Sequence, residues 1–426
     1  MSDVPFNSLP HSQKRISKSI ERSAQWLSTI LVPLNLSSTA GVQDLQKNAS
    51  NLQNNSSSSV PRLNVFVHMV GGIKPAARSA FAAALLEPLE SKEKELLRLE
   101  TLDEGVSGYV FDLVPLRMAF GEEQAENMAS NHRSHLSSLA DSFAPLIRAS
   151  LQDLPDTKLR LVNTVRSPHE MLKLIRDAGI DLFDTYWAQQ AASWGVALDF
   201  CFPVPVAQDQ QQEVTGEIET RQIGHNLYEE RFAHEFTSLA DSFVSELEFA
   251  KRGHESSVPS HIGGSLAEIR VCSCAACSPT WSNHPLVHST VDDVGRATIE
   301  PASPYTRAYV HHLLHTHEMS AHALLVMHNL TVMNAFMSGV RGVLERDRVK
   351  ADGTLLNEDN PSSFAVEVGR FERTYDIRLQ VLDEAKVSWA EVDFARGKGR
   401  LARERERAKP FGDVSDTTTA NLENQK

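Results

Sequence analysis

Cys272-Ser273-Cys274-Ala275-Ala276-Cys277 is the stretch around which the chain is organised, because it places three of the four cysteines within six residues. The spacing C-x-C-x-x-C directs three thiolates toward one point on a tight turn. Zinc prefers four ligands in a tetrahedron, drawn from cysteine sulfur and histidine nitrogen. The fourth ligand must therefore come from elsewhere, and the candidates are the downstream histidines at positions 284, 288, 311, 312, 315, 317, 322 and 328.

A histidine-rich helix is predicted after this cysteine cluster. Ser303-Pro304 is typical of an N-cap followed by proline at the first helical position. From Tyr305 to Met337 the sequence contains neither glycine nor proline, so we predict a helix with one break near Ser320. His328 lies one turn after Leu324, on a face that we expect to pack inward.

Other interpretations of these residues stay open at this point. His328 can be a hydrogen-bonded core histidine, and the three cysteines can be unrelated buried thiols. The close spacing of the cysteines favours metal or redox chemistry, because such clusters in intracellular proteins commonly serve one or the other. A hydrolytic zinc enzyme is disfavoured, since three thiolates and a histidine fill the coordination sphere and leave no position for water.

The cysteine cluster and the helix together resemble the zinc subdomain of the tRNA-guanine transglycosylases. The resemblance covers C-x-C-x-x-C, the run Tyr305-Thr-Arg-Ala-Tyr-Val-His-His-Leu313, Glu318, and His328-Asn329-Leu330. It implies one structural zinc ion bound by Cys272, Cys274, Cys277 and His328. This chain departs from the family in having residues 278 to 304 between the third cysteine and the helix, and we interpret this polar stretch as a surface insertion.

The composition of the chain limits the class of protein. Its 426 residues carry a formal net charge of −13, with 41% hydrophobic and 23% charged residues. This hydrophobic content is ordinary for a globular protein, whereas the acidity argues against a protein that binds nucleic acid with its whole surface. Cys201, alone in an apolar run, is predicted to be a small buried side chain.

No membrane-spanning segment or signal peptide is predicted. No apolar run approaches the ~20 residues that a spanning helix needs, and the N-terminus lacks the apolar core of a signal peptide. We therefore expect a cytoplasmic protein. Peripheral attachment to the mitochondrial outer membrane is a further expectation, which comes from the resemblance.

Apolar runs alternate with helical patterns in the first half of the chain, which predicts parallel βα units. Four strands are half of a (β/α)8 barrel, and the resemblance implies the last four strands of a TIM-type barrel in an N-terminally truncated chain. A half barrel leaves an edge strand exposed, so we expect instability without a partner. The predicted strands are 63–70, 106–114, 159–165 and 180–186, and the predicted helices are 13–31, 75–100, 121–153 and 168–178.

Three regions are predicted along the chain. Residues 1–202 form the partial barrel, with a linker-like insertion at 43–60 and a further strand at 196–202. Residues 203–350 form a zinc-binding subdomain with insertions at 207–222, 241–267 and 278–304. Residues 351–426 form a C-terminal extension with a partly disordered tail. Its basic segment, residues 396–409, is predicted to be a solvated face, because isolated basic segments add affinity for nucleic acid without specificity.

The resemblance also implies a reaction, in which an aspartate attacks the ribose of a tRNA nucleotide and guanine is replaced by a modified base. Asp184 matches the position of this nucleophile. Catalytic members continue with Pro-Thr-Arg and a second arginine three residues later, whereas this chain has Ala188-Gln189-Gln190 and then Ser193. Val70 replaces the glutamine of the family's Gln-Gly-Gly, and residues 107–111 replace its glycine-rich base-recognition strand. We therefore expect Asp184 to be inactive and the chain to be non-catalytic.

A member of the family with the zinc ligands and without the active site is expected to pair with a catalytic subunit of the same fold. The resemblance then implies exchange of guanine for queuine by the heterodimer, at anticodon wobble position 34 of tRNAs with GUN anticodons (Asp, Asn, His, Tyr). It also implies contact with tRNA through the complex. The alternative is a catalytically active tRNA-guanine transglycosylase with Asp184 as nucleophile, and base exchange by the isolated chain would separate the two.

Overall fold

The computed structural model describes residues 12–32, 63–127, 135–205, 220–241, 272, 274–277, 287–291, 297–301, 305–351 and 363–408. Several predicted segments lie outside these residues: the linker at 43–60, most of the insertions at 207–222 and 241–267, and the tail beyond residue 408.

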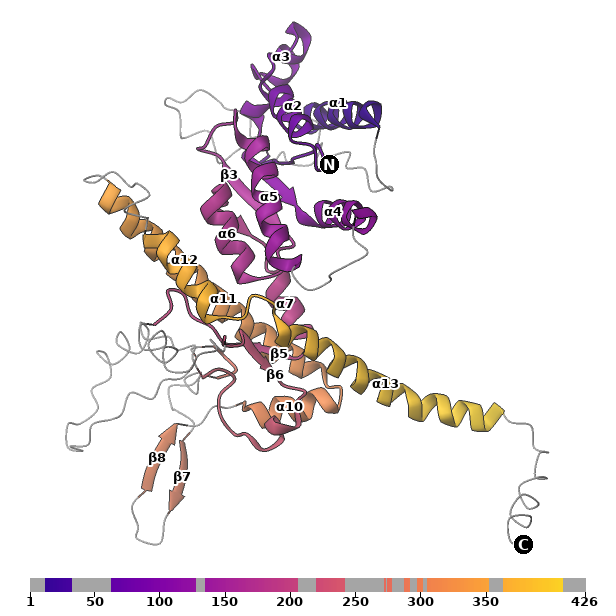
Figure 1. Ribbon diagram of the computed structural model, residues 1–426, viewed down its shortest axis with the longest axis vertical. Helices are drawn as coiled ribbons and strands as arrows, with labels where there is room; N and C mark the ends of the chain where they lie inside the picture. Colours follow the sequence, from indigo (N-terminus) through magenta and orange to yellow (C-terminus); the bar gives the residue numbers. More distant parts are fainter. Residues whose placement is uncertain are drawn as a thin grey trace, which may run out of the picture. The chain divides into compact units, whose positions relative to one another are not determined.

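The chain forms two compact units that are interleaved in the sequence (Figure 1). Unit 1 comprises residues 1–189, 202–221 and 336–378, and unit 2 comprises residues 190–201, 222–335 and 379–426. The predicted boundaries at 202 and 350 stay predictions.

Unit 1 is built on a four-stranded parallel sheet in the order β1-β2-β3-β4, which confirms the predicted α/β class with parallel strands. Each strand is shorter than the apolar run that predicted it. The runs extend into buried loops, where residues such as Val165 and Ile180 are enclosed without joining the ladder. The strands are β1 (Phe66–His68), β2 (Gly108–Asp112), β3 (Leu159–Asn163) and β4 (Leu182–Phe183).

Helices follow the strands of unit 1. The elements are α1 (Gln13–Ile30), α2 (Pro75–Leu86), α3 (Ser91–Leu97), η3 (Asp103–Gly105), α4 (Leu113–Asn127), α5 (His135–Leu151) and α6 (Pro168–Ala178). α6 matches its prediction: Ser167 accepts a hydrogen bond from the Glu170 amide, and Gly179 ends the helix at φ 63°. The helix predicted at 75–100 divides into α2 and α3, with Pro88 between them. The helix predicted at 121–153 divides into α4 and α5.

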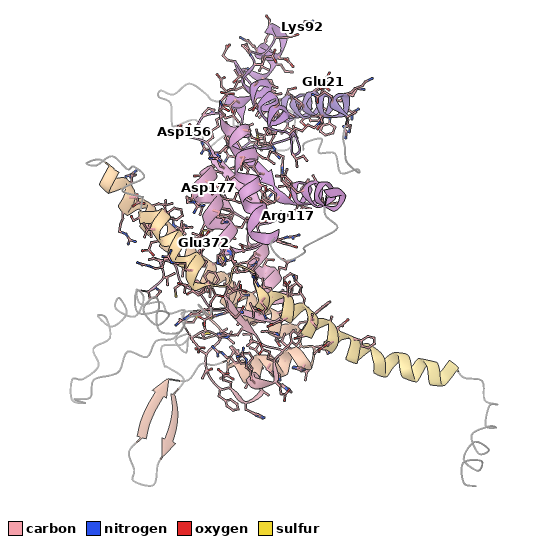
Figure 2. All side chains as sticks on the ribbon, in the orientation of Figure 1. Glu21, Lys92, Arg117, Asp156, Asp177 and Glu372 are labelled. Carbon is pink, nitrogen blue, oxygen red and sulfur yellow. The ribbon has the colours of Figure 1, made fainter. Side chains whose placement is uncertain are left out.

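A buried ion pair connects α4 to α6. Nη2 of Arg117 lies 2.7 Å from Oε2 of Glu170, and both side chains are 7% exposed (Arg117 is labelled in Figure 2). The same guanidinium donates to the carbonyl of Thr164 and lies over the ring of Phe143. Because breaking a buried pair leaves an uncompensated charge, this contact fixes α4 and α6 relative to each other.

α12 (Ser363–Thr374) contributes to the core of unit 1, which was not predicted from the sequence. This helix packs on α6 and buries Phe364, Val368 and Phe371. The rings of Phe202 and Phe336 lie 6.0 Å or less from that of Phe371. Residues 363–375 are therefore part of a hydrophobic core, although the sequence analysis placed them in a C-terminal extension.

His169, in the first turn of α6, predicts an acid-sensitive stability of unit 1. Its ring is 2% exposed, and Nε2 donates to the carbonyl of Tyr375 at 3.3 Å. Burial lowers the pKa of His169 to about 4, against a weaker opposing effect of the Tyr375 hydrogen bond. The unfolded chain takes up a proton near pH 6.5 and the folded chain does not. The neutral buried ring therefore costs no folding free energy above pH 6.5. As the pH falls from 6.5 toward 4, the free energy of unfolding decreases by up to about 3 kcal/mol.

Urea unfolding of the full chain between pH 7.5 and 4.5 measures this effect. We expect His169→Gln to flatten the pH dependence relative to the wild type, because glutamine does not titrate. His312→Gln on α10, where the histidine is exposed, is the matched control and should leave the wild-type profile unchanged. Parallel profiles for the wild type and His169→Gln would contradict the assignment to His169.

Unit 2 contains the segment that follows α7 (Tyr186–Ser193). β5 (Val196–Leu198) and β6 (Gly224–Asn226) form an antiparallel pair, so the predicted strand at 196–202 is shorter and does not join the parallel sheet. η5 (Glu230–His234) follows, and a hairpin of β7 (Val287–Val291) and β8 (Ala297–Pro301) lies within the predicted insertion 278–304. Cys201 is half-buried rather than fully buried.

The predicted histidine-rich helix is two helices, α10 (Arg307–His315) and α11 (Met319–Ala351). This confirms the predicted break near Ser320: it falls at residues 316–318, where His317 adopts φ 60°. The N-cap is Thr306, whose hydroxyl accepts from the Tyr309 amide at 3.3 Å, so the predicted capping by Ser303 is wrong. Ser303 and Pro304 themselves lie outside the described residues. The last helix of the described chain is α13 (Gln380–Ala408), in unit 2.

α11 is the one helix among the described residues that is long and apolar enough to cross a membrane, and 39% of its most apolar window is buried. Within unit 2 it buries Leu325, His328 and Asn329 completely. Two fully buried polar side chains that hydrogen-bond to protein groups are typical of a core helix. The composition of α11 is therefore weak evidence for a membrane span.

Candidate metal centre

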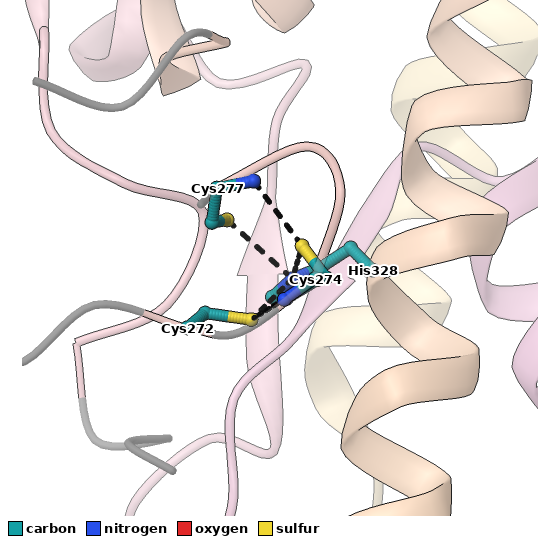
Figure 3. A group of neighbouring side chains, drawn as sticks. All are labelled: Cys272, Cys274, Cys277 and His328. Carbon is teal, nitrogen blue, oxygen red and sulfur yellow. Dashed lines mark hydrogen bonds between the residues drawn. The ribbon is translucent and has the colours of Figure 1, made fainter. Parts of the chain in front are cut away.

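Three cysteines and one histidine converge in unit 2 (Figure 3). Cys272, Cys274 and Cys277 lie on a tight turn that is closed by the amide of Cys277 donating to the carbonyl of Cys274 at 3.1 Å. His328 reaches the turn from α11. The four side chains are between 0% and 2% exposed. The structure therefore brings together the four residues that the resemblance implied as ligands.

The spacing of the four ligand atoms fits a tetrahedral zinc ion. Nδ1 of His328 lies 3.5 Å from Sγ of Cys272, 3.5 Å from Sγ of Cys274 and 3.7 Å from Sγ of Cys277. Zinc–sulfur and zinc–nitrogen bonds of ordinary length, set at tetrahedral angles, separate nitrogen from sulfur by about 3.6 Å. The donor set and its geometry therefore fit one zinc ion with no open coordination position.

The thiols of this centre affect one another's pKa. Hydrogen bonds with Cys274 and Cys277 raise the pKa of Cys272, whereas hydrogen bonds with Cys272 and Cys277 lower the pKa of Cys274. Without a cation, neighbouring thiolates repel each other, so the thiols compete for the charged form. A divalent metal ion removes this competition, because coordinated thiols are deprotonated.

The residues behind His328 fix its orientation. Nε2 of His328 donates to the carbonyl of Leu198 in β5 at 2.8 Å, which leaves Nδ1 free to face the three sulfur atoms. Asn329 continues the contact with the same strand. Its Nδ2 donates to the carbonyl of Val196 at 3.0 Å, and its Oδ1 accepts from the amide of Leu198 at 2.9 Å. The His328-Asn329 pair thus connects the metal centre to β5.

Asn329→Ala should destabilise unit 2 while leaving all four metal ligands in place. The substitution leaves a buried carbonyl and a buried amide of β5 unpaired, at a cost of about 2–4 kcal/mol. Thermal unfolding and the rate of metal transfer to a chromogenic chelator measure the effect. Asn334→Ala, at an exposed position of the same helix, is the matched control. Equal effects of the two substitutions would contradict a role for the Asn329 contacts.

A second group of possible metal ligands is an ion-pair network. Asp199, His225 and Asp241 lie close together, and the guanidinium of Arg307 contacts two of them. Nη2 of Arg307 lies 2.8 Å from Oδ2 of Asp241 and 3.1 Å from Nε2 of His225, and Nη1 pairs with Glu235. The buried guanidinium supplies a positive charge beside these acidic side chains. The network was not predicted from the sequence, because no local pattern joins these residues.

Asp184, the predicted counterpart of the nucleophile, lies just after β4 in unit 1. Its Oδ2 accepts from the amide of Thr164 at 2.8 Å, and its Oδ1 accepts from the amide of Tyr186 at 3.3 Å. Thr164 adopts φ 63°, and its hydroxyl lies 3.2 Å from Oδ1 of Asp112. Both oxygens of Asp184 therefore hold the main chain that follows β3 and β4. In α7, Ala188 is buried, so its side chain belongs to the core of the protein.

Parts of the chain are similar to known proteins. The family model described as "Queuine tRNA-ribosyltransferase" matches residues 297–358. Proteins named "Queuine tRNA-ribosyltransferase accessory subunit 2" are similar to this chain. The one from Homo sapiens is 28% identical over 224 residues, which are 48% of this chain and 41% of that protein. The one from Schizosaccharomyces pombe is 26% identical over 300 residues, which are 70% of this chain and 53% of that protein. The chain is a homologue of these accessory subunits.

The matches cover only part of the relatives. The chain spans 41% of the human protein and 53% of the Schizosaccharomyces pombe protein. The region matched by the family model contains all of α10 and α11, and therefore includes Arg307, His328 and Asn329. The histidine of the metal centre and the arginine of the ion-pair network both lie within the matched residues.

Proposed function

We propose that this chain is a non-catalytic accessory subunit of a heterodimeric queuine tRNA-ribosyltransferase. In the complex it supports exchange of guanine for queuine at wobble position 34 of tRNAs with GUN anticodons (Asp, Asn, His, Tyr). The names of its relatives support the accessory role. The observation that carries the non-catalytic assignment is the engagement of both carboxylate oxygens of Asp184 by main-chain amides.

A nucleophilic carboxylate has to present a lone pair to the anomeric carbon of a ribose that is held in place through its phosphates. Asp184 instead binds the amides of Thr164 and Tyr186. The helix beside it offers Ala188 and Gln189, neither of which can bind a phosphate as an arginine does. A lone carboxylate outside such a constellation supports a structural role.

The metal centre has a structural role in this proposal. Cys272, Cys274, Cys277 and His328 hold one zinc ion, which supplies stability and no reactive water, since its coordination sphere is closed. The parallel sheet of unit 1 supports the further proposal that it corresponds to the last four strands of a TIM-type barrel. The subunit acts in the cytoplasm and attaches peripherally to the mitochondrial outer membrane. Fractionation with the endogenous protein tests this: exclusive recovery in another compartment would contradict it.

We expect Asp184→Asn to leave base exchange by the reconstituted heterodimer within about twofold of wild type. Asparagine keeps the acceptor oxygen for one of the two hydrogen bonds of Asp184 and removes the negative charge and the second acceptor. Incorporation of labelled guanine or queuine into a GUN-anticodon tRNA measures the rate. Asp181→Asn is the matched control, because Asp181 also accepts a main-chain hydrogen bond, from Arg160 at 2.8 Å.

Two results would overturn the non-catalytic assignment. One is a rate of base exchange that falls by about 10³-fold or more in the Asp184→Asn complex, the scale expected for deletion of a nucleophile, while the Asp181→Asn complex keeps its rate. The other is base exchange by the isolated chain without any partner. Either would support the alternative, in which the chain is an active transglycosylase with Asp184 as nucleophile.

A further inference from the structure

α1, the first helix of unit 1, carries a row of exposed side chains that is basic at one end and apolar at the other. The helix packs through a different side, where Ile16 and Leu27 are buried. Residues spaced four apart lie next to one another along a helix. The exposed residues at this spacing, which we call the α1 row, are Lys14, Lys18, Arg22, Trp26 and Ile30. The helix contains four basic residues and one acidic residue, Glu21 (labelled in Figure 2), hence a net charge of +3.

The first four turns of α13, in unit 2, have the opposite charge around exposed apolar side chains. Val387 is 59% exposed and Phe394 is 62% exposed. The two side chains lie on the same face, because seven residues make nearly two turns of helix. Asp383 and Glu391 are exposed on that face too, and we call these four residues the α13 row. Residues 380–394 contain four acidic residues and one basic residue, hence a net charge of −3.

The charges of the two rows match at one spacing. Lys14 and Arg22 are eight residues apart, and so are Asp383 and Glu391. When the two helices lie parallel with Lys14 opposite Asp383, Arg22 is therefore opposite Glu391. Each basic side chain then faces an acidic one across the contact, which is the complementarity that guides one protein surface to another.

The apolar members of the rows match in the same alignment. Trp26 lies twelve residues after Lys14, and Phe394 lies eleven residues after Asp383, so the two rings fall opposite each other. Contact between the rings removes apolar surface from water and adds an aromatic pair. Trp26 is 42% exposed in the folded chain, so a second molecule is needed to cover it.

We propose that two copies of this chain pair through these rows, with the α1 row of each copy on the α13 row of the other. A reciprocal pair of contacts related by a twofold axis closes as a dimer. Exposed charge pairs are individually weak and are screened by salt. The dimer is therefore expected to form at roughly micromolar concentration and to weaken as the ionic strength rises.

An anionic membrane is the other partner that a basic helix with an exposed tryptophan fits. A membrane accounts for the α1 row alone, because its negative surface repels the acidic residues of the α13 row. Pairing of two copies accounts for the charge and the apolar surface of both rows with one kind of contact. The second copy is therefore the favoured partner.

Charge reversal in each row, followed by mixing, tests the proposal with the full chain. Lys14→Glu/Arg22→Glu reverses the α1 row, and Asp383→Lys/Glu391→Lys reverses the α13 row. Sedimentation velocity over a range of micromolar concentrations, at low and high salt, gives the dissociation constant of the dimer. Each variant alone should dimerise at least about tenfold more weakly than the wild type, because four charge pairs become repulsive. An equimolar mixture of the two variants should dimerise like the wild type, because reversed rows again face opposite charges.

Lys74→Glu/Lys92→Glu is the matched control, because it makes the same change of charge at exposed positions of unit 1 outside α1 (Lys92 is labelled in Figure 2). Its dissociation constant should stay within about twofold of wild type. Circular dichroism verifies that each variant folds. The test needs no catalytic subunit, so its result is independent of the proposed function.

Three results would overturn the proposal. The first is a wild-type chain that stays monomeric over the whole concentration range. The second is a mixture of the two variants that dimerises no better than either variant alone. The third is unchanged dimerisation of the α1 variant with loss of its sedimentation on phosphatidylserine–phosphatidylcholine vesicles, which would assign the α1 row to a membrane.

Discussion

Removal of the metal should unfold the part of unit 2 that surrounds the cysteine turn. The four ligand atoms are buried, and they join the turn at Cys272–Cys277 to α11, which in turn holds β5 through Asn329. Structural zinc sites contribute on the order of 10 kcal/mol of apparent binding free energy, which is comparable to the whole stability of a domain. We therefore expect the double variant Cys274→Ser/His328→Ala, and the chelated wild type, to lose cooperative unfolding of unit 2.

Elemental analysis and hydrogen exchange together measure this result. The wild type should contain one zinc ion per chain and the double variant none, with protection lost in α10, the first half of α11 and β5. Cys201→Ser is the matched control, because Cys201 belongs to unit 2 and lies outside the centre. A metal-free wild type, full occupancy of the double variant, or unchanged protection after chelation would contradict the prediction.

The parts of the fold that the sequence predicted correctly are specified by neighbouring residues. Ser167 and Gly179 delimit α6 because a cap and a left-handed glycine act within one turn. The three cysteines converge for the same reason. His328 was different, since spacing left eight histidines as candidates, and only the resemblance to a family singled it out.

The parts that the sequence did not predict depend on distant contacts. β5 has an apolar sequence like that of the parallel strands, and only its pairing with β6 makes it antiparallel. The Arg307 network joins residues from β6, α10 and the segment that follows η5, and no local sequence pattern marks it. α12 is an exception, because Phe364, Val368 and Phe371 recur at helical spacing. This local pattern is sufficient to predict a helix with one buried face.

The start of α10 presents the surface that we expect to bind the catalytic subunit. Tyr305 is 37% exposed and Tyr309 is 45% exposed, with their rings 5.7 Å apart. Phe236 is 75% exposed and lies close to the start of α10. Its chain neighbours Glu235 and Thr237 accept hydrogen bonds from the first main-chain amides of that helix. Exposed aromatic residues on a rigid helix are typical anchors of a protein interface.

Tyr305→Glu/Tyr309→Glu should abolish co-elution of the chain with a catalytic transglycosylase subunit at micromolar concentration. An interface stable enough to isolate buries at least ~1,000 Å², and anchors near its centre contribute about 2 kcal/mol or more each, so loss of two should weaken the complex by about 1,000-fold or more. Chelation of the metal should also abolish co-elution, because it disorders the unit that presents the two rings. Trp389→Glu/Phe394→Glu changes two aromatic residues of α13 in the same unit that are at least as exposed, and it should leave the complex intact. Co-elution of the tyrosine variant at wild-type level, or equal loss in the α13 variant, would show that the partner binds elsewhere.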